Sequence, residues 1–140
     1  MNITIIDGQG GLLGAQLVKE ISANFPSASV TAIGTNAMAT AAMLKAGAKQ
    51  AATGENPVVV ACRHTDFIIG PIGIVIADSM LGEVTPNMAV AIGQADAMRI
   101  LIPVNKCENL VAGVSSISTK ALLEDVVEKL KKQIEESEEK

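Results

Sequence analysis

Short β-branched runs alternate with segments of helical spacing along most of the chain. Residues 3–7 predict a strand, and residues 12–24 predict a helix because apolar side chains recur there every three or four positions. The same criteria predict strands at 29–33, 50–53, 67–69 and 99–104 and helices at 35–45, 57–64, 85–97 and 118–134. This alternation predicts a three-layer, Rossmann-like, doubly wound α/β fold with a mainly parallel sheet of about five strands.

One segment in the middle of the chain supports two interpretations. Consecutive valines at 58–60 favour a strand. Asn56 followed by Pro57 instead matches a helix N-cap and the first helical position, and we favour the helix. A helix here places Cys62 and His64 away from the carboxyl ends of the strands. We therefore expect a small core residue and a surface residue rather than a nucleophilic pair.

The second half of the chain is less regular. Residues 74–81 match neither period, and residues 110–114 are expected to form a short edge strand. Ser118 is the expected N-cap of the final helix. A single folded domain is therefore expected over residues 1–134, followed by a charged segment at 135–140 that frays from the helix end.

Composition narrows the class of protein. Hydrophobic residues make up 49% and charged residues 19% of the 140, which favours one compact domain. With two aromatic residues and a net charge of −4, neither base stacking nor a basic stripe supports nucleic-acid binding. A strand starting at residue 3 leaves no room for a signal peptide, and two cysteines without CxxC spacing suit a cytoplasmic protein. With a single histidine, a zinc site would need an unusual set of ligands.

The longest uncharged apolar stretch runs from Phe67 to Ala77. It is too short to span a bilayer and contains glycine and proline, so no membrane association is expected. Its apolar content exceeds what one small core covers, which predicts a homodimer.

The first strand runs directly into a glycine-rich turn, Gly8-Gln9-Gly10-Gly11, with Gly14 soon after. Such a turn lets backbone N–H groups approach an anion at a helix N-terminus. The spacing departs by one residue from GxGxxG, and no lysine follows Gly14 as it would in a Walker loop. The turn therefore predicts a nucleotide or other anion site, or else only close packing of strand against helix.

Residues beside the turn bear on the choice of ligand. Asp7 would repel a pyrophosphate unless its carboxylate binds a ribose, a cation or a backbone amide. Thr35 and Asn36, either of which can cap the second helix, stand where an NAD-binding protein carries an acidic residue. The expected cofactor is NAD(P) or another nucleotide, with no metal.

Several polar or glycine-rich loops should meet at one edge of the sheet, because parallel α/β proteins bind ligands outside the carboxyl ends of the strands. Lys106 either balances a ligand phosphate there or is simply an exposed lysine. The residues predicted to bind the cofactor are Asp7, Gly8, Gln9, Gly10, Gly11, Gly14, Thr35, Asn36, Gly70, Asn105 and Lys106.

Carboxylates supply the remaining candidates. Glu55 is expected in solvent near the N-terminal end of the helix that follows it. Asp78 and Glu83 lie among apolar residues, where burial would raise a carboxylate pKa and permit general acid–base chemistry. Spacing alone assigns no catalytic residue.

Six distinctive segments are spread over nearly the whole chain before its charged tail. They are Ile6-Asp7-Gly8-Gln9-Gly10-Gly11, Gly34-Thr35-Asn36, Met43-Leu44-Lys45-Ala46-Gly47-Ala48, Thr53-Gly54-Glu55-Asn56, Gly70-Pro71-Ile72-Gly73-Ile74 and Ile102-Pro103-Val104-Asn105-Lys106-Cys107. In these segments the chain resembles a family of short bacterial proteins of unknown function, each about one Rossmann-like domain long. The first half has a weaker likeness to the NAD(P)-binding halves of dehydrogenases. The resemblance implies the fold and a bacterial source, but no activity.

The sequence as a whole predicts a cytoplasmic, dimeric protein that binds a nucleotide at residues 8–14. Two alternatives stay open. One is a non-catalytic sensor or scaffold for another anionic metabolite. The other is a small enzyme in which Asp7, Glu55 or Lys106 takes part, because fold does not decide function.

Overall fold

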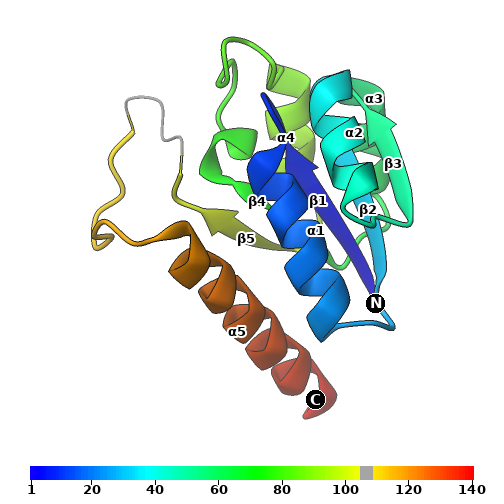
Figure 1. The fold of residues 1–140 in the computed structure, drawn as a ribbon, viewed down its shortest axis with the longest axis vertical. Helices are drawn as coiled ribbons and strands as arrows, with labels where there is room; N and C mark the ends of the chain where they lie inside the picture. The colour runs from blue at the N-terminus through cyan, green and yellow to red at the C-terminus, as the bar shows by residue number, and fades with distance from the viewer. Residues whose placement is uncertain (105–108) are drawn as a thin grey trace.

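The computed structural model describes residues 1–104 and 109–140. Figure 1 shows the arrangement of its helices and strands. In chain order they are β1 (Asn2–Asp7), α1 (Leu12–Asn24), β2 (Ser29–Gly34), α2 (Ala37–Lys45), β3 (Gln50–Thr53), α3 (Glu55–Ala61), β4 (Phe67–Pro71), the 3-10 helix η1 (Ile72–Val75), α4 (Pro86–Gln94), β5 (Met98–Ile102) and α5 (Thr119–Glu138). The described part of the chain contains no helix long and apolar enough to cross a membrane.

The five strands form one parallel sheet in the order β3-β2-β1-β4-β5. β1 pairs along its whole length with β2, from Asn2 opposite Ser29 to Asp7 opposite Gly34, and pairs with β4 on its other side. The predicted Rossmann-like α/β fold is confirmed. Because the strand order reverses between β1 and β4, the loops after these two strands leave the sheet in different directions. This creates the kind of crevice in which such folds bind ligands.

Helices cover both faces of the sheet because successive strand side chains point to opposite sides. Ile3 and Ile5 of β1 belong to the core that α1, α2 and α5 cover. Ile6 belongs to a second core, covered by α3, α4 and η1. Figure 1 shows α5 beside α1, on the same side of the sheet.

The helical interpretation of the 57–64 segment is confirmed, but its predicted cap is wrong. α3 begins at Glu55, its N-cap is Gly54, and no side chain caps it. Gly54 has a φ of 102°, which favours glycine, so the chain enters the helix before Asn56 can act as the cap. The other expected caps hold: Asn36 accepts from Ala39 N–H, and Ser118 accepts from Ala121 N–H.

Two further assignments change. The expected edge strand at 110–114 is wrong, because these residues form no strand and contain a turn. Residues 74–81 form the end of η1 followed by turns. α5 continues to Glu138, so the charged segment at 135–140 begins as part of this helix.

The apolar stretch from Phe67 to Ala77 supplies β4, an inner strand of the sheet, and then η1. Ile68, Ile69 and Ile74 are fully buried within the chain itself. Most of this stretch therefore offers no surface to a second copy, and the homodimer stays a prediction without this support.

Candidate functional site

The glycine turn links β1 to α1 at the carboxyl end of the sheet. It is closed by a 3.0 Å hydrogen bond from Gly11 N–H to the carbonyl of Gly8. Gly11 is the N-cap of α1 and has a φ of 73°, which only glycine adopts readily. Within the described chain, the backbone N–H groups of Gly10, Leu12 and Leu13 have no hydrogen-bond acceptor. Three amides at a helix N-terminus are thus open to a ligand or to water.

Asp7 binds backbone amides of its own turn. Its Oδ1 accepts from Gly8 N–H at 2.8 Å, and its Oδ2 accepts from Gly14 N–H at 2.7 Å. The side chain is only 5% exposed. Burial raises the pKa of Asp7 above its ordinary value, the two amides oppose this rise, and the nearby charge of Glu83 adds to it. Of the roles open to Asp7 from the sequence, the structure supports binding to backbone amides.

Three glycines of the turn and helix are required by packing. A Cβ at Gly8 would lie 2.5 Å from Thr35 Oγ1, and one at Gly14 would lie 2.5 Å from Met43 Sδ. A Cβ at Gly11 would lie 2.6 Å from the backbone of α2. Gly10 differs, because nothing lies within 4 Å of a Cβ built there. The packing interpretation therefore explains positions 8, 11 and 14 and leaves Gly10 unexplained.

A carboxylate from elsewhere in the chain already occupies the space beside this turn. Glu83 Oε1 accepts three hydrogen bonds, from Gln9 N–H at 2.9 Å, Thr35 Oγ1 at 2.7 Å and Asn36 Nδ2 at 2.6 Å. We call these three donors the cradle. Two of its residues follow β2 and one follows β1, so two neighbouring strand ends supply it, as expected for the carboxyl edge of a parallel sheet.

The pKa of Glu83 differs from what the sequence suggests. Burial alone would raise it, but the hydrogen bonds from Gln9, Thr35 and Asn36 together hold it below its ordinary value. Glu83 is therefore a stably charged carboxylate and not a general acid with a raised pKa. Sequence reasoning singled it out only as a carboxylate among apolar residues, because no local pattern reveals donors that lie 47 or more positions away in the chain.

Glu83 belongs to the tight turn that connects η1 to α4. We call residues 78–84 of this connection the 78–84 segment. Its backbone is closed by hydrogen bonds from Asp78 N–H to Val84 O and from Val84 N–H to Ser79 O. Three non-glycine residues in it have positive φ: Asp78, Met80 and Leu81. A run of left-handed residues costs conformational free energy and calls for a compensating interaction or function.

Comparisons with known proteins place the chain in a family. A family model described as a domain of unknown function (DUF3842) matches residues 2–135. The chain belongs to the DUF3842 family. No curated protein matches it significantly. A solved structure of a dodecameric FMN-dependent UbiX-like decarboxylase from Escherichia coli O157:H7 is similar over 96% of this chain and 94% of that chain, with 11% sequence identity and a TM-score of 0.45.

The DUF3842 chain brings together most of the residues predicted for the site. Asp7, Gly8, Gln9, Thr35 and Asn36 are joined by the bonds described above. Gly70 lies at the end of β4, where a Cβ would come 2.3 Å from the carbonyl oxygen of Ile6, so strand packing accounts for it. Asn105 and Lys106 lie outside the described residues.

The structure gives Glu55, Cys62 and His64 structural positions and no direct part in the site. Glu55 is not simply solvated, because its Oε1 accepts from the hydroxyl of Thr85 at 2.6 Å and so links the first turns of α3 and α4. Cys62 is buried in the second core and His64 is exposed, both as expected. The described residues include no group of three or more His, Cys, Asp or Glu that could hold a metal ion.

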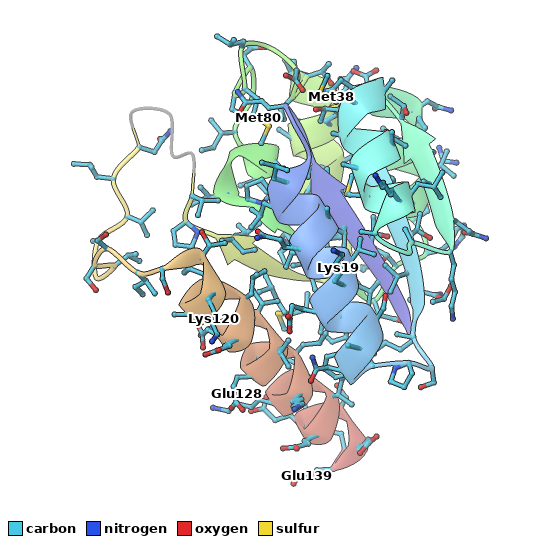
Figure 2. The ribbon with its side chains drawn as sticks, in the orientation of Figure 1. Lys19, Met38, Met80, Lys120, Glu128 and Glu139 are labelled. Atoms are coloured by element: carbon cyan, nitrogen blue, oxygen red, sulfur yellow. The ribbon has the colours of Figure 1, made fainter. Side chains whose placement is uncertain are left out.

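Three exposed apolar side chains lie within four positions in sequence of the residues that form the cradle or of Glu83. Leu12 follows the turn and is 77% exposed, Met38 follows Asn36 and is 70% exposed, and Leu81 precedes Glu83 and is 99% exposed. Figure 2 shows Met38 and Met80 at one end of the molecule, with Glu139 at the opposite end. A polar cradle with an apolar rim suits a ligand that joins an anionic group to an apolar ring.

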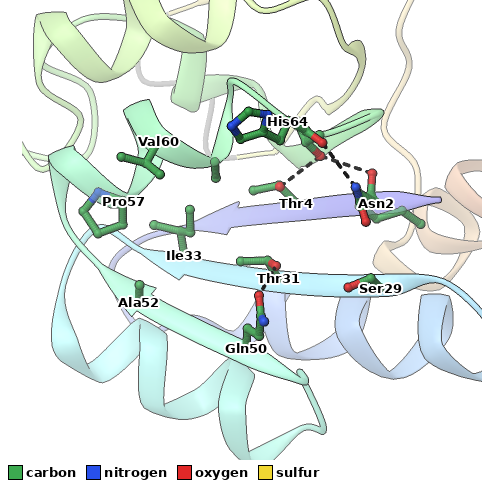
Figure 3. Close-up of a pocket in the computed structure, with 13 residues that line it drawn as sticks. Asn2, Thr4, Ser29, Thr31, Ile33, Gln50, Ala52, Pro57, Val60 and His64 are labelled. Atoms are coloured by element: carbon green, nitrogen blue, oxygen red, sulfur yellow. Dashed lines mark hydrogen bonds between the residues drawn. The ribbon is translucent and has the colours of Figure 1, made fainter.

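A separate cavity of about 370 Å³ lies on the face of the sheet beside α3. Figure 3 shows its floor, with Thr4 and Thr31 on the strands and Val60 and His64 on the α3 side. Thr4 is buried at this cavity, and Thr31 is partly buried. Its polar groups are partly occupied with one another, as in the 3.0 Å hydrogen bond between the hydroxyls of Thr4 and Thr65.

Proposed function

We propose that this DUF3842 protein binds a small phosphate-bearing ligand, a nucleotide or dinucleotide, at the turn of residues 8–14. The observation that carries the proposal is the convergence of three donors, from the loops after β1 and β2, on a single carboxylate oxygen. Donors that hold one anionic oxygen so closely have the chemistry needed to hold a phosphate oxygen.

The N-terminus of α1 supplies a second set of donors. The free amides of Gly10, Leu12 and Leu13 stand at the positive end of the helix dipole, where a further phosphate oxygen would be favoured. Gly10 is the one glycine of the turn with open space around its Cα. A ligand can therefore approach the backbone closely at Gly10, which gives this glycine a role that packing does not.

The site supports nucleotide binding without indicating which nucleotide. β2 itself ends in Gly34-Thr35-Asn36, without an acidic residue of its own for a ribose diol, and the carboxylate found beside it, Glu83, is held by the cradle. The exposed rim of Leu12, Met38 and Leu81 offers apolar contact to a base or isoalloxazine ring. A panel of ligands that differ in the base and share the phosphate is therefore the appropriate probe.

The experiment is a thermal-shift screen against NAD, NADH, NADP, NADPH, FMN, FAD, ATP, GTP and S-adenosylmethionine. A ligand at 100 times its dissociation constant adds about 2.7 kcal/mol to the free energy of unfolding. We expect a shift that disappears in Gly10→Val and persists in Gly93→Val, since both glycines have open space and only Gly10 is at the turn. No shift with any ligand, or equal shifts in both variants, would refute the proposal.

A binding role without catalysis is favoured over an enzyme by the state of Asp7. Both of its carboxylate oxygens are engaged by backbone amides, and Glu83 is held by the cradle. Neither carboxylate is free to exchange a proton with a substrate in this arrangement. Turnover of a bound nucleotide, lost in Asp7→Asn while binding persists, would favour the enzyme instead.

A further inference from the structure

The cradle holds an anion that belongs to the protein itself. We propose that Glu83 occupies the subsite of the ligand's phosphate group, so that the phosphate and the Glu83 carboxylate compete for the same three donors. This inference rests on the proposed function and adds a mode of regulation to it: the 78–84 segment is an internal competitor that keeps the site closed to weakly bound anions.

The Glu83 carboxylate and a ligand phosphate would compete for one subsite, because both would need the same three hydrogen-bond donors. Gln9 N–H, Thr35 Oγ1 and Asn36 Nδ2 all point to Glu83 Oε1 at 2.6–2.9 Å. A carboxylate oxygen and a phosphate oxygen are both negatively charged, and they accept hydrogen bonds of similar length. One donor group cannot serve both oxygens fully, so entry of one anion requires departure of the other.

The route of departure is short, because Met80 and Val84 on either side of Glu83 are buried, whereas the Glu83 side chain is held by the hydrogen bonds of the cradle. Val84 is 1% exposed and Met80 is 3% exposed, so the backbone on both sides of Glu83 is fixed in the second core. Ser79 Oγ also donates to the carbonyl of Gly73, which secures the base of the segment. Between these points Leu81 and Gly82 are exposed. Rotation of the Glu83 side chain toward solvent frees the cradle without unfolding the segment.

The strained backbone of the segment is consistent with this role. Asp78, Met80 and Leu81 all have φ between 57° and 66°, where side chains are disfavoured. An ordinary connection between η1 and α4 has no need of such a conformation, whereas one that must deliver a carboxylate to a fixed point does.

Competition raises the apparent dissociation constant of the ligand: the intrinsic constant is divided by the fraction of molecules whose cradle is free. If Glu83 leaves the cradle in about one molecule in ten or fewer, its removal tightens anion binding about tenfold or more. The effect is confined to the cradle, so a carboxylate elsewhere in the same segment should have no comparable influence.

The test uses inorganic phosphate as the probe and follows the amide signals of Gln9 and Asn36 in the isotope-labelled protein by NMR. We expect phosphate to bind Glu83→Ala about tenfold or more tightly than the wild type, with Glu83→Gln in between because its amide oxygen is a neutral acceptor. Asp78→Asn is the matched control: it removes the same charge from the same segment, Asp78 makes no side-chain contact with the cradle, and asparagine tolerates its positive φ. Adding Thr35→Val to Glu83→Ala should abolish the gain.

Equal phosphate affinity in the wild type and both Glu83 variants would overturn the inference. So would an equal gain in Asp78→Asn, a gain that survives Thr35→Val, or no binding to any variant. The nucleotide screen keeps the proposed function separate. A nucleotide that binds through Gly10 with the same affinity in Glu83→Ala leaves the function standing and removes the competitor. If phosphate binds Glu83→Ala more tightly and no nucleotide binds at all, the competition by Glu83 stands and the proposed nucleotide binding is refuted.

Discussion

Gly14→Ala should destabilise the protein, although it lies in a helix, where alanine is ordinarily more stable than glycine by about 1 kcal/mol. A Cβ at position 14 would lie 2.5 Å from Met43 Sδ and 2.8 Å from Asp7 Cβ. Met43 is fully buried and Asp7 is held by two backbone amides, so neither can move away easily. Overpacking of this kind costs about 1–3 kcal/mol, which offsets or exceeds the gain in helix propensity.

Gly93→Ala is the matched control for this substitution. Gly93 also lies in a helix, α4, but nothing lies within 4 Å of a Cβ built there. It should stabilise the protein by roughly 0.5–1 kcal/mol, so the two variants should differ by about 1–3 kcal/mol. Denaturant unfolding followed by far-ultraviolet circular dichroism suits a chain without Trp or Tyr. If Gly14→Ala proves as stable as Gly93→Ala, the close packing of α1 on β1 described here is wrong.

Two further predictions concern the carboxylates of the site. Asp7→Ala leaves the amides of Gly8 and Gly14 without their acceptor, so it should lower the free energy of unfolding by about 2–4 kcal/mol in denaturant titrations. An unchanged unfolding midpoint would contradict the role of Asp7 in holding the turn. Because hydrogen bonds hold the pKa of folded Glu83 below its ordinary value of 4.5, its charge stabilises the fold above that pH, and this contribution is lost as the pH falls through the folded pKa. Stability measured against pH should therefore decline less below about pH 4.5 in Glu83→Gln than in the wild type or Asp78→Asn, and parallel curves would exclude the effect.

The parallel sheet and most helices could be predicted because their signals are local. The run ending at Asp7, the caps at Asn36 and Ser118 and the helical spacing of α1 each lie within a few residues of the element they specify. The helix at α3 was predictable from proline at an early helical position, yet its first residue was not. The positive φ of Gly54 that sets it depends on how the chain leaves β3.

The sequence predicts an anion site at the glycine turn, which stays a prediction, but it does not predict that Glu83 lies beside the turn. Glu83 reaches Gln9 and Thr35 across 74 and 48 positions of the chain, through a segment whose turns follow no periodic pattern. The same limit applies to Asp7: the sequence leaves a ribose, a cation and a backbone amide open as its partner, and the structure shows its two oxygens bound to the amides of Gly8 and Gly14. Which of several partners a carboxylate binds is a tertiary property, decided by packing that one sequence does not display.

An amide-resolved NMR titration with NAD, FMN and ATP, which share phosphate groups and differ in their rings, tests whether the glycine turn binds a nucleotide. We expect at least one of them to perturb the amides of Gly10, Leu12 and Leu13 first, since these are the unpaired donors at the turn. Perturbation centred on Thr31 and His64, which line the cavity beside α3, would place the ligand elsewhere and contradict the account. Unchanged signals at the turn with all three would contradict it equally.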